Sequence, residues 1–165
     1  MAEEIIEQGY RELADTILEH NPGVDLGRVR AAFELADRAH SGQKRKAGTP
    51  YVTHCVAAAQ ICAEMGLDED SIVAALLHDC IEDTAITHED IARQFGAEVA
   101  DIVEGVTKLT RVQFTSREDE QMENLRKMLM AMAKDIRVIL VKIADRLHNM
   151  RTMEYMVAQK QLEKS

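Results

Sequence analysis

The pattern of apolar and polar positions is helical along most of the chain. Apolar residues recur at intervals of three or four, which places them on one side of an α-helix. Gly, Pro and capping residues divide the pattern into about eight segments, the first six expected near 4–19, 25–40, 51–65, 68–79, 87–95 and 97–106. A seventh is expected to start after the candidate cap Ser116, and an eighth to follow Asp135 and run to about residue 156. Pairs of strand-like segments, with alternating apolar and polar residues and a turn between them, are not evident. The expected fold is therefore an all-α helical bundle.

Two polar stretches interrupt this pattern. Residues 41–50 include the basic run Lys44-Arg45-Lys46 and are expected to form a loop. Residues 107–115 are also expected to form a loop, and a short hairpin near 108–113 stays open as an alternative. Residues 157–164 have the composition of a helix that continues past the last predicted segment.

Composition fits one globular domain over residues 1–165, a length that can bury a core. Aromatic residues make up only 4% of the chain, which favours helices over strands. Apolar stretches are too short to cross a membrane, and the acidic N-terminus is unlike a signal peptide. We therefore expect a cytoplasmic protein that does not bind membranes.

Charge and cysteine content narrow the function further. A net charge of −9 argues against a general nucleic-acid binder, which needs a broad basic face. The negative charge leaves open a phosphorylated small molecule as the ligand. A bound cation and a few local Lys or Arg residues can make the electrostatic field in one cleft positive. Cys55, Cys62 and Cys80 are odd in number and lack C-x-x-C spacing, so buried reduced thiols are expected rather than a disulfide or a zinc site.

The most informative residues are His78 and Asp79, which follow an apolar run and are expected to be buried. Adjacent side chains on a helix point about 100° apart, so the two can bind one ion only at a helix end or together with other ligands. His54 and Asp145 supply such ligands. Two imidazoles and two carboxylates suit Mn²⁺, Fe²⁺ or Zn²⁺ better than Ca²⁺. His20, His40 and His88 are expected to be ordinary core or surface residues.

Further polar residues could complete an active site. If the helix continues past Asp79, Glu82 and Asp83 share faces with His78 and Asp79 and could orient or deprotonate a metal-bound water. A solvated acidic helix end is the simpler interpretation, but the helix dipole disfavours acids there unless a cation lies nearby. Asp145, Asn149 and Thr152 fall on one helical face, so the last two could contact a bound ligand. His148 lies just off this face and is expected to support the site from outside or to be structural.

Four strings carry a resemblance to a known family. They are Gln43–His54 (QKRKAGTPYVTH), His78–Thr84 (HDCIEDT), Glu104–Leu109 (EGVTKL) and Lys142–Thr152 (KIADRLHNMRT). The order His, His-Asp, Asp resembles the HD-domain metal-dependent phosphohydrolases. The longer strings resemble the hydrolase domain of RelA/SpoT-type alarmone enzymes, from about the second predicted helix onward.

This resemblance implies Mn²⁺-dependent hydrolysis of guanosine tetra- and pentaphosphate, (p)ppGpp, at the 3′ side, giving GDP or GTP and pyrophosphate. It implies His54, His78, Asp79 and Asp145 as ligands of one divalent ion, with Glu82 and Asp83 activating water. It also implies nucleotide contacts by Arg45, Lys46, Tyr51, Asn149 and Thr152. Another HD-domain nucleotide phosphohydrolase, or a module that binds the alarmone without hydrolysing it, stays open as an alternative.

Two features depart from the family pattern. Ala47 stands where the family often has Ser, so one polar contact to the nucleotide is expected to be missing. Family hydrolases normally continue with more helices than this chain has, so it is expected to be an HD domain truncated at its C-terminus, with an unusually short stand-alone hydrolase as the alternative. The oligomeric state is not indicated by the sequence.

Overall fold

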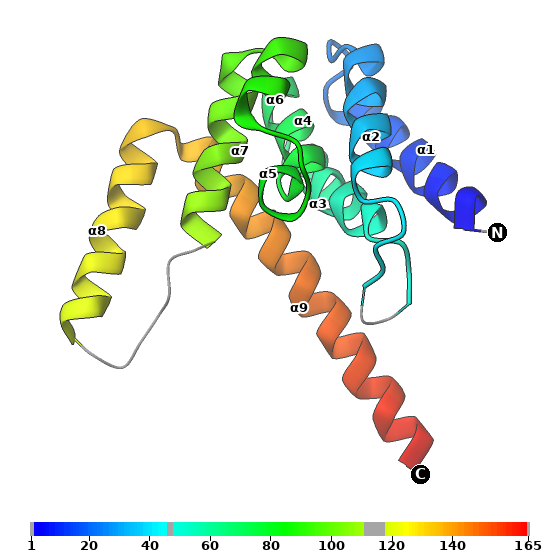
Figure 1. Cartoon of the computed structure of the whole chain (residues 1–165). Helices are drawn as coiled ribbons and strands as arrows, with labels where there is room; N and C mark the ends of the chain where they lie inside the picture. Colours follow the sequence, from blue (N-terminus) through cyan, green and yellow to red (C-terminus); the bar gives the residue numbers. More distant parts are fainter. Residues whose placement is uncertain (1, 46–47, 111–117, 165) are drawn as a thin grey trace.

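The computed structural model of the chain describes residues 2–45, 48–110 and 118–164 (Figure 1). Nine α-helices and one isolated β-bridge, between Lys44 and Pro50, occupy these residues. The helices are α1 (Ala2–His20), α2 (Leu26–Ala39), α3 (Val52–Glu64), α4 (Glu69–Leu77), α5 (Cys80–Asp83), α6 (His88–Phe95), α7 (Ala97–Thr110), α8 (Glu118–Lys134) and α9 (Ile136–Lys164). The predicted all-α bundle is confirmed.

The number of helices differs from the prediction in one place. The segment expected to run to Asp79 ends at Leu77, and α5 is a separate short helix that was not predicted. The prediction of a loop from Thr107 was also wrong, because α7 continues to Thr110, and a hairpin at 108–110 is excluded. The rest of the predicted loop, 111–115, and the candidate cap Ser116 lie outside the described residues.

Local capping explains where several helices begin. Asp25 accepts hydrogen bonds from the backbone N–H groups of Gly27 and Arg28 at the start of α2, as expected for an N-cap. Thr87 and Asp90 form a reciprocal capping box at the start of α6. Gly96 ends that helix with φ 101°, a conformation that favours glycine.

Helices α3 and α4 form the centre of the bundle. Helix α3 packs against α1, α4 and α9, while α4 also contacts α2 and α7. Every residue of α4 from Ser71 to Leu77 is buried, so this helix has no solvent-facing side along that stretch. All three cysteines are free and buried, in agreement with the sequence analysis. Helices α3 and α4 are therefore rigid supports for any side chain at their ends.

Helix α9 has two parts with different surroundings. Val138, Val141 and Ala144 of its first part are buried against the bundle, whereas Met153 of its second part is 65% exposed. Figure 1 shows the second part projecting beyond the bundle, and α8 standing beside α7 at one edge. Among the described residues, helices with the length and apolar character of a membrane span are absent.

Candidate metal centre

His78 and Asp79 lie at the break between α4 and α5. The helix does not continue through them, so the expected i, i+4 relation of His78 to Glu82 on one helix is wrong. Asp79 instead occupies the N-cap position of α5, with φ −98° and ψ −2°. This break turns the two adjacent side chains toward each other, and Nε2 of His78 lies 3.0 Å from Oδ2 of Asp79. Sequence reasoning required either a helix end at this point or further ligands beside the pair, and the structure has a helix end here.

Two other helices bring side chains to the same place. His54 comes from the first turn of α3 and Asp145 from the middle of α9. Oδ1 of Asp145 lies 2.6 Å from Nε2 of His54 and 3.1 Å from Nε2 of His78. One ligand atom from each of His54, His78, Asp79 and Asp145 lies within 4.8 Å of the others. The four predicted ligand residues therefore form one cluster, in which only Asp79 is more than slightly exposed.

The backbone sets the tautomer of His78. Its Nδ1 lies 2.5 Å from the carbonyl oxygen of Ala75, one turn earlier in the chain. Because a carbonyl can only accept, Nδ1 carries the proton and donates it to Ala75. In the neutral ring Nε2 is then unprotonated and faces the cluster, as a metal ligand requires.

Each of the other three ligands also has a specific outer partner. The hydroxyl of Tyr51 donates to Oδ2 of Asp79 at 2.7 Å. The ammonium group of Lys142 donates to Oδ2 of Asp145 at 2.8 Å and to the hydroxyl of Thr110 at 2.9 Å. Nδ1 of His54 lies 2.7 Å from Nδ1 of His148. Such outer contacts fix the orientation of side chains that bind metal.

The pKa shifts show that the cluster favours positive charge. Burial opposes ionisation of Asp79, but the hydrogen bond with His78 outweighs it and lowers the pKa of Asp79 to about 2. Burial likewise opposes ionisation of Asp145, yet hydrogen bonds with His54 and His78 hold its pKa well below the usual value. Burial disfavours a charged His78, but hydrogen bonds to Asp145 and Asp79 raise its pKa to about 10. A divalent cation could supply that positive charge in place of the proton.

Glu82 and Asp83 lie on the exposed side of α5, next to this cluster. The backbone N–H of Asp83 donates to the carbonyl oxygen of Asp79 at 3.0 Å, so the turn fixes Asp83 relative to one candidate ligand. Partial burial, together with the charge of Asp79, raises the pKa of Asp83. A carboxylate with a raised pKa is a better proton acceptor near neutral pH.

Of the candidate nucleotide-binding residues, Arg45 and Tyr51 lie beside the cluster. A guanidinium nitrogen of Arg45 donates to Oδ1 of Asn149 at 2.9 Å, which joins the basic loop to α9. Thr152 donates to the backbone carbonyl of His148 within its own helix. Tyr51 contacts Asp79, so it supports a candidate ligand. Lys46 lies outside the described residues.

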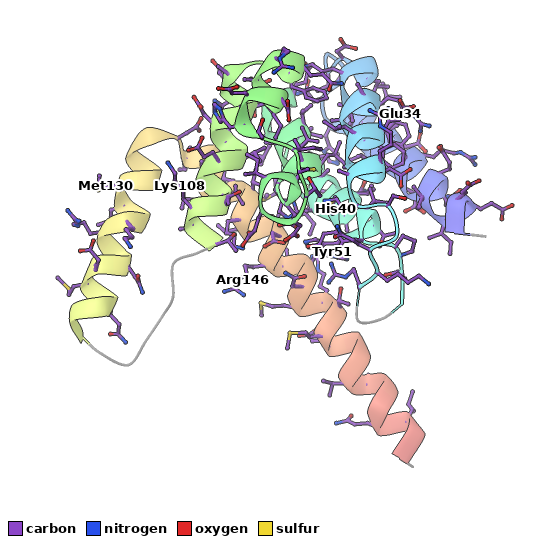
Figure 2. All side chains as sticks on the ribbon, in the orientation of Figure 1. Glu34, His40, Tyr51, Lys108, Met130 and Arg146 are labelled. Atoms are coloured by element: carbon purple, nitrogen blue, oxygen red, sulfur yellow. The ribbon has the colours of Figure 1, made fainter. Side chains whose placement is uncertain are left out.

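Two residues near the site were given no role in the sequence analysis. Lys142 precedes Asp145 by three positions on α9, and that spacing is the signal that could have indicated the contact. His40 was expected to be ordinary and is buried, with its ring centroid 4.7 Å from that of Tyr51. Figure 2 labels His40 and Tyr51 beside the loop between α2 and α3. His40 thus supports Tyr51 from behind, and Tyr51 contacts Asp79.

A second group of possible ligands fits a metal poorly. Nε2 of His88 lies 2.9 Å from Asp101 and 3.4 Å from Glu104 on the surface of α6 and α7. Lys108 pairs with Glu104 at 3.0 Å and already neutralises one carboxylate. The side chain of Asp101 is 72% exposed, so water can replace any ligand there. The buried cluster, by contrast, has two imidazoles, two carboxylates and fixed outer partners, which suits a divalent ion.

Comparison with known proteins shows the family to which the chain belongs. Residues 32–165 match the family described as HD domain. SpoT of Escherichia coli strain K12, described as a bifunctional (p)ppGpp synthase/hydrolase, is 51% identical over 144 residues, which are 87% of this chain and 20% of SpoT. The guanosine-3′,5′-bis(diphosphate) 3′-pyrophosphohydrolase of Haemophilus influenzae is 55% identical over 119 residues, 72% of this chain and 18% of that protein.

A solved structure gives the same result. It belongs to a metazoan ortholog of SpoT described as hydrolysing ppGpp, and it matches with a TM-score of 0.62 and 32% identity over 78% of this chain and 71% of that one. The chain spans only about a fifth of the length of the curated relatives named above. The chain belongs to the HD domain family and, as its motifs predict, is a relative of the RelA/SpoT-type enzymes.

Proposed function

We propose that the chain is a metal-dependent hydrolase that removes pyrophosphate from the 3′ position of (p)ppGpp, giving GDP or GTP. The observation that carries the proposal is the buried cluster of His54, His78, Asp79 and Asp145, with Arg45 and Asn149 beside it. The relatives support the substrate, since SpoT is described as a (p)ppGpp synthase/hydrolase and its metazoan ortholog as hydrolysing ppGpp.

The four cluster residues would hold one divalent cation, and their mixed nitrogen and oxygen donors suit Mn²⁺, Fe²⁺ or Zn²⁺. Among these we propose Mn²⁺, the ion that the resemblance to RelA/SpoT-type enzymes implies. When bound, such a cation lowers the pKa of a coordinated water. Glu82 and Asp83 would accept the proton of the attacking water. The reaction adds the elements of water across the bond between the 3′ oxygen and its phosphorus, so the ribose keeps a 3′ hydroxyl and pyrophosphate leaves.

The remaining residues would bind and orient the nucleotide. Arg45 offers a planar cation suited to stacking on a base or to paired contacts with phosphate oxygens. Its hydrogen bond to Asn149 holds the guanidinium in place before substrate arrives. Asn149 and Thr152 lie on the face of α9 that also carries Asp145, so contacts from these residues would position the nucleotide relative to the cation.

The test is incubation of Mn²⁺-loaded protein with ppGpp, followed by chromatography of the nucleotides and measurement of pyrophosphate. Equal amounts of GDP and pyrophosphate are expected, with none after the metal is removed by a chelator. The proposal fails if protein that contains its metal releases no GDP. Tight ppGpp binding by calorimetry without turnover would then favour a module that binds the alarmone without hydrolysing it. Faster hydrolysis of nucleoside monophosphates would favour a different nucleotide phosphohydrolase.

A further inference from the structure

His148 contacts the candidate ligand His54 on the side of its ring that faces away from the cluster. It lies on α9, three residues after Asp145, and its Nδ1 is 2.7 Å from Nδ1 of His54. The two rings stack, with centroids 4.9 Å apart and an interplanar angle of 28°. One ring nitrogen of His54 therefore points toward the cluster, and the other points toward His148. The contact between the two rings joins α3 to α9.

The chemistry of this contact allows only one proton between the two nitrogens. When Nε2 of a neutral His54 binds a cation through its lone pair, the proton of that ring must be on Nδ1. Nδ1 of His148 must then accept it, and the proton of His148 must be on Nε2. His78 reaches the same state through a carbonyl group, which can only accept. His54 depends on a partner that can either donate or accept, so the tautomer of His148 matters.

We propose that His148 is a positioning residue, which accepts the Nδ1–H of His54 and thereby presents an unprotonated Nε2 of His54 to the metal. The inference rests on the metal centre proposed above. His148 does not bind the metal in this scheme. It acts through His54, in the way that a carbonyl or carboxylate orients a metal-binding histidine in other proteins.

Packing alone is the competing explanation, because the stacked ring of His148 also fills space beside His54. Two variants separate the two roles. His148→Phe retains an aromatic ring for stacking but has no acceptor. His148→Asn loses the ring but places an amide oxygen close to the position of Nδ1, so it can still accept the proton of His54.

The experiment measures the affinity of the purified chain for Mn²⁺ and Zn²⁺ by competition with a chromogenic chelator. His148→Phe is expected to weaken metal binding by about 10- to 100-fold, the range for loss of an outer partner. His148→Asn should retain an affinity close to that of the unmodified protein. His20→Phe, an exposed position at the end of α1, is the matched control and should change nothing.

A spectroscopic measurement tests the tautomers without a variant. In Zn²⁺-loaded, ¹⁵N-labelled protein, long-range proton–nitrogen spectra should show the proton of His54 on Nδ1 and that of His148 on Nε2. A proton on Nδ1 of His148 would overturn the inference. Unchanged metal affinity in His148→Phe together with a loss in His148→Asn would also overturn it and would assign His148 a packing role. Equal losses in the two variants would overturn it as well, because an acceptor at this position would then not be enough to keep the metal affinity.

The same data distinguish this inference from the proposed function. If the unmodified protein takes up no divalent metal, the metal centre itself is wrong and the inference falls with it. If the unmodified protein binds metal and hydrolyses ppGpp but His148→Phe binds metal equally well, only the inference is wrong. Thermal unfolding of each variant shows whether it is folded. If His148→Phe does not fold, the Asn variant and the spectrum decide.

Discussion

Nε2 of His54 lies 2.6 Å from Oδ1 of Asp145, although 91 residues separate the two in the chain. Both side chains are buried, His54 on α3 and Asp145 on α9. The contact therefore depends on the packing of these two helices and not on local sequence. Any change that shifts α9 against α3 should alter the candidate metal centre before it alters the rest of the bundle.

Asp145→Asn tests the centre directly. The amide keeps the size of the side chain but loses the negative charge, and Asp145 contacts both imidazoles. Metal affinity is expected to fall by more than the roughly 100-fold typical of an outer partner, measured as metal content after dialysis against a buffered metal solution. Asp101→Asn, in the exposed group with His88, is the control and should retain the metal. If Asp145→Asn still binds a full equivalent of metal, Asp145 is not a ligand.

Glu82→Gln and Asp83→Asn separate catalysis from metal binding. Both residues lie on α5 outside the cluster, so the metal should stay bound. Turnover of ppGpp should fall by about 10²- to 10⁴-fold for the residue that accepts the proton of the attacking water. Steady-state rates at saturating ppGpp, with metal content measured in parallel, provide the test. Glu89→Gln on α6 is the control. If Glu82→Gln and Asp83→Asn both leave the rate unchanged, the two acidic residues of α5 have a structural role.

Arg45→Ala should weaken substrate binding without affecting the metal. A hydrogen bond to a charged group contributes about 1.5–3 kcal/mol, which corresponds to about a 10- to 150-fold rise in KM for ppGpp. Arg93→Ala removes an exposed arginine of α6 and should leave KM unchanged. Arg45 is assigned to the wrong step if the variant loses kcat and metal together while KM stays constant.

Metal uptake should release a proton. Hydrogen bonds to Asp145 and Asp79 outweigh burial and raise the pKa of His78 to about 10, so at pH 7–8 the metal-free ring is protonated and must lose that proton to bind. The same shift stabilises the metal-free fold below pH 6.5, and this stabilisation is lost as the pH rises through 10. Calorimetry in two buffers of different ionisation enthalpy should give about one proton released per Mn²⁺. If no proton is released on metal binding, the metal-free ring of His78 does not carry the proton that the metal would displace.

The sequence predicted the helical architecture and the composition of the cluster, but not its geometry. Capping at Asp25 and Thr87 follows from local chemistry, so these helix starts could be predicted. His78 and Asp79 were identified because acidic and imidazole groups follow an apolar run. Periodicity cannot show the break that brings His78 and Asp79 together, nor the contact that Asp145 of a distant helix makes with His78.

The outer partners were harder to predict than the ligands. Lys142, Tyr51 and His148 reach the cluster through single hydrogen bonds whose geometry depends on how α3, α4 and α9 pack. The extension of α7 to Thr110 was missed because polar residues there resemble a loop. One of these residues, Thr110, accepts a hydrogen bond from Lys142, so a polar residue within the helix makes a tertiary contact.

The close approach of α7 to α9 gives a stability prediction at Gly105. A Cβ added there would lie 2.7 Å from Cγ2 of Val138, a buried residue with little room to move. Overpacking costs about 1–3 kcal/mol, which is partly offset by the helix propensity of alanine, about 1 kcal/mol over glycine. Gly105→Ala is thus expected to lower the free energy of unfolding by up to about 2 kcal/mol in urea titrations.

Gly9→Ala is the matched control for that substitution, because its added Cβ would meet Val56 at an ordinary 3.6 Å. It should stabilise the protein by up to about 1 kcal/mol through helix propensity alone. Combining Gly105→Ala with Val138→Ala should cost less than the sum of the two single variants, since the second change removes the clash of the first. Additive losses, or stabilisation by Gly105→Ala equal to that at Gly9, would show that α7 and α9 are not in this close contact. The position of Asp145 relative to α7 would then need revision, because Val138 and Asp145 lie on the same helix.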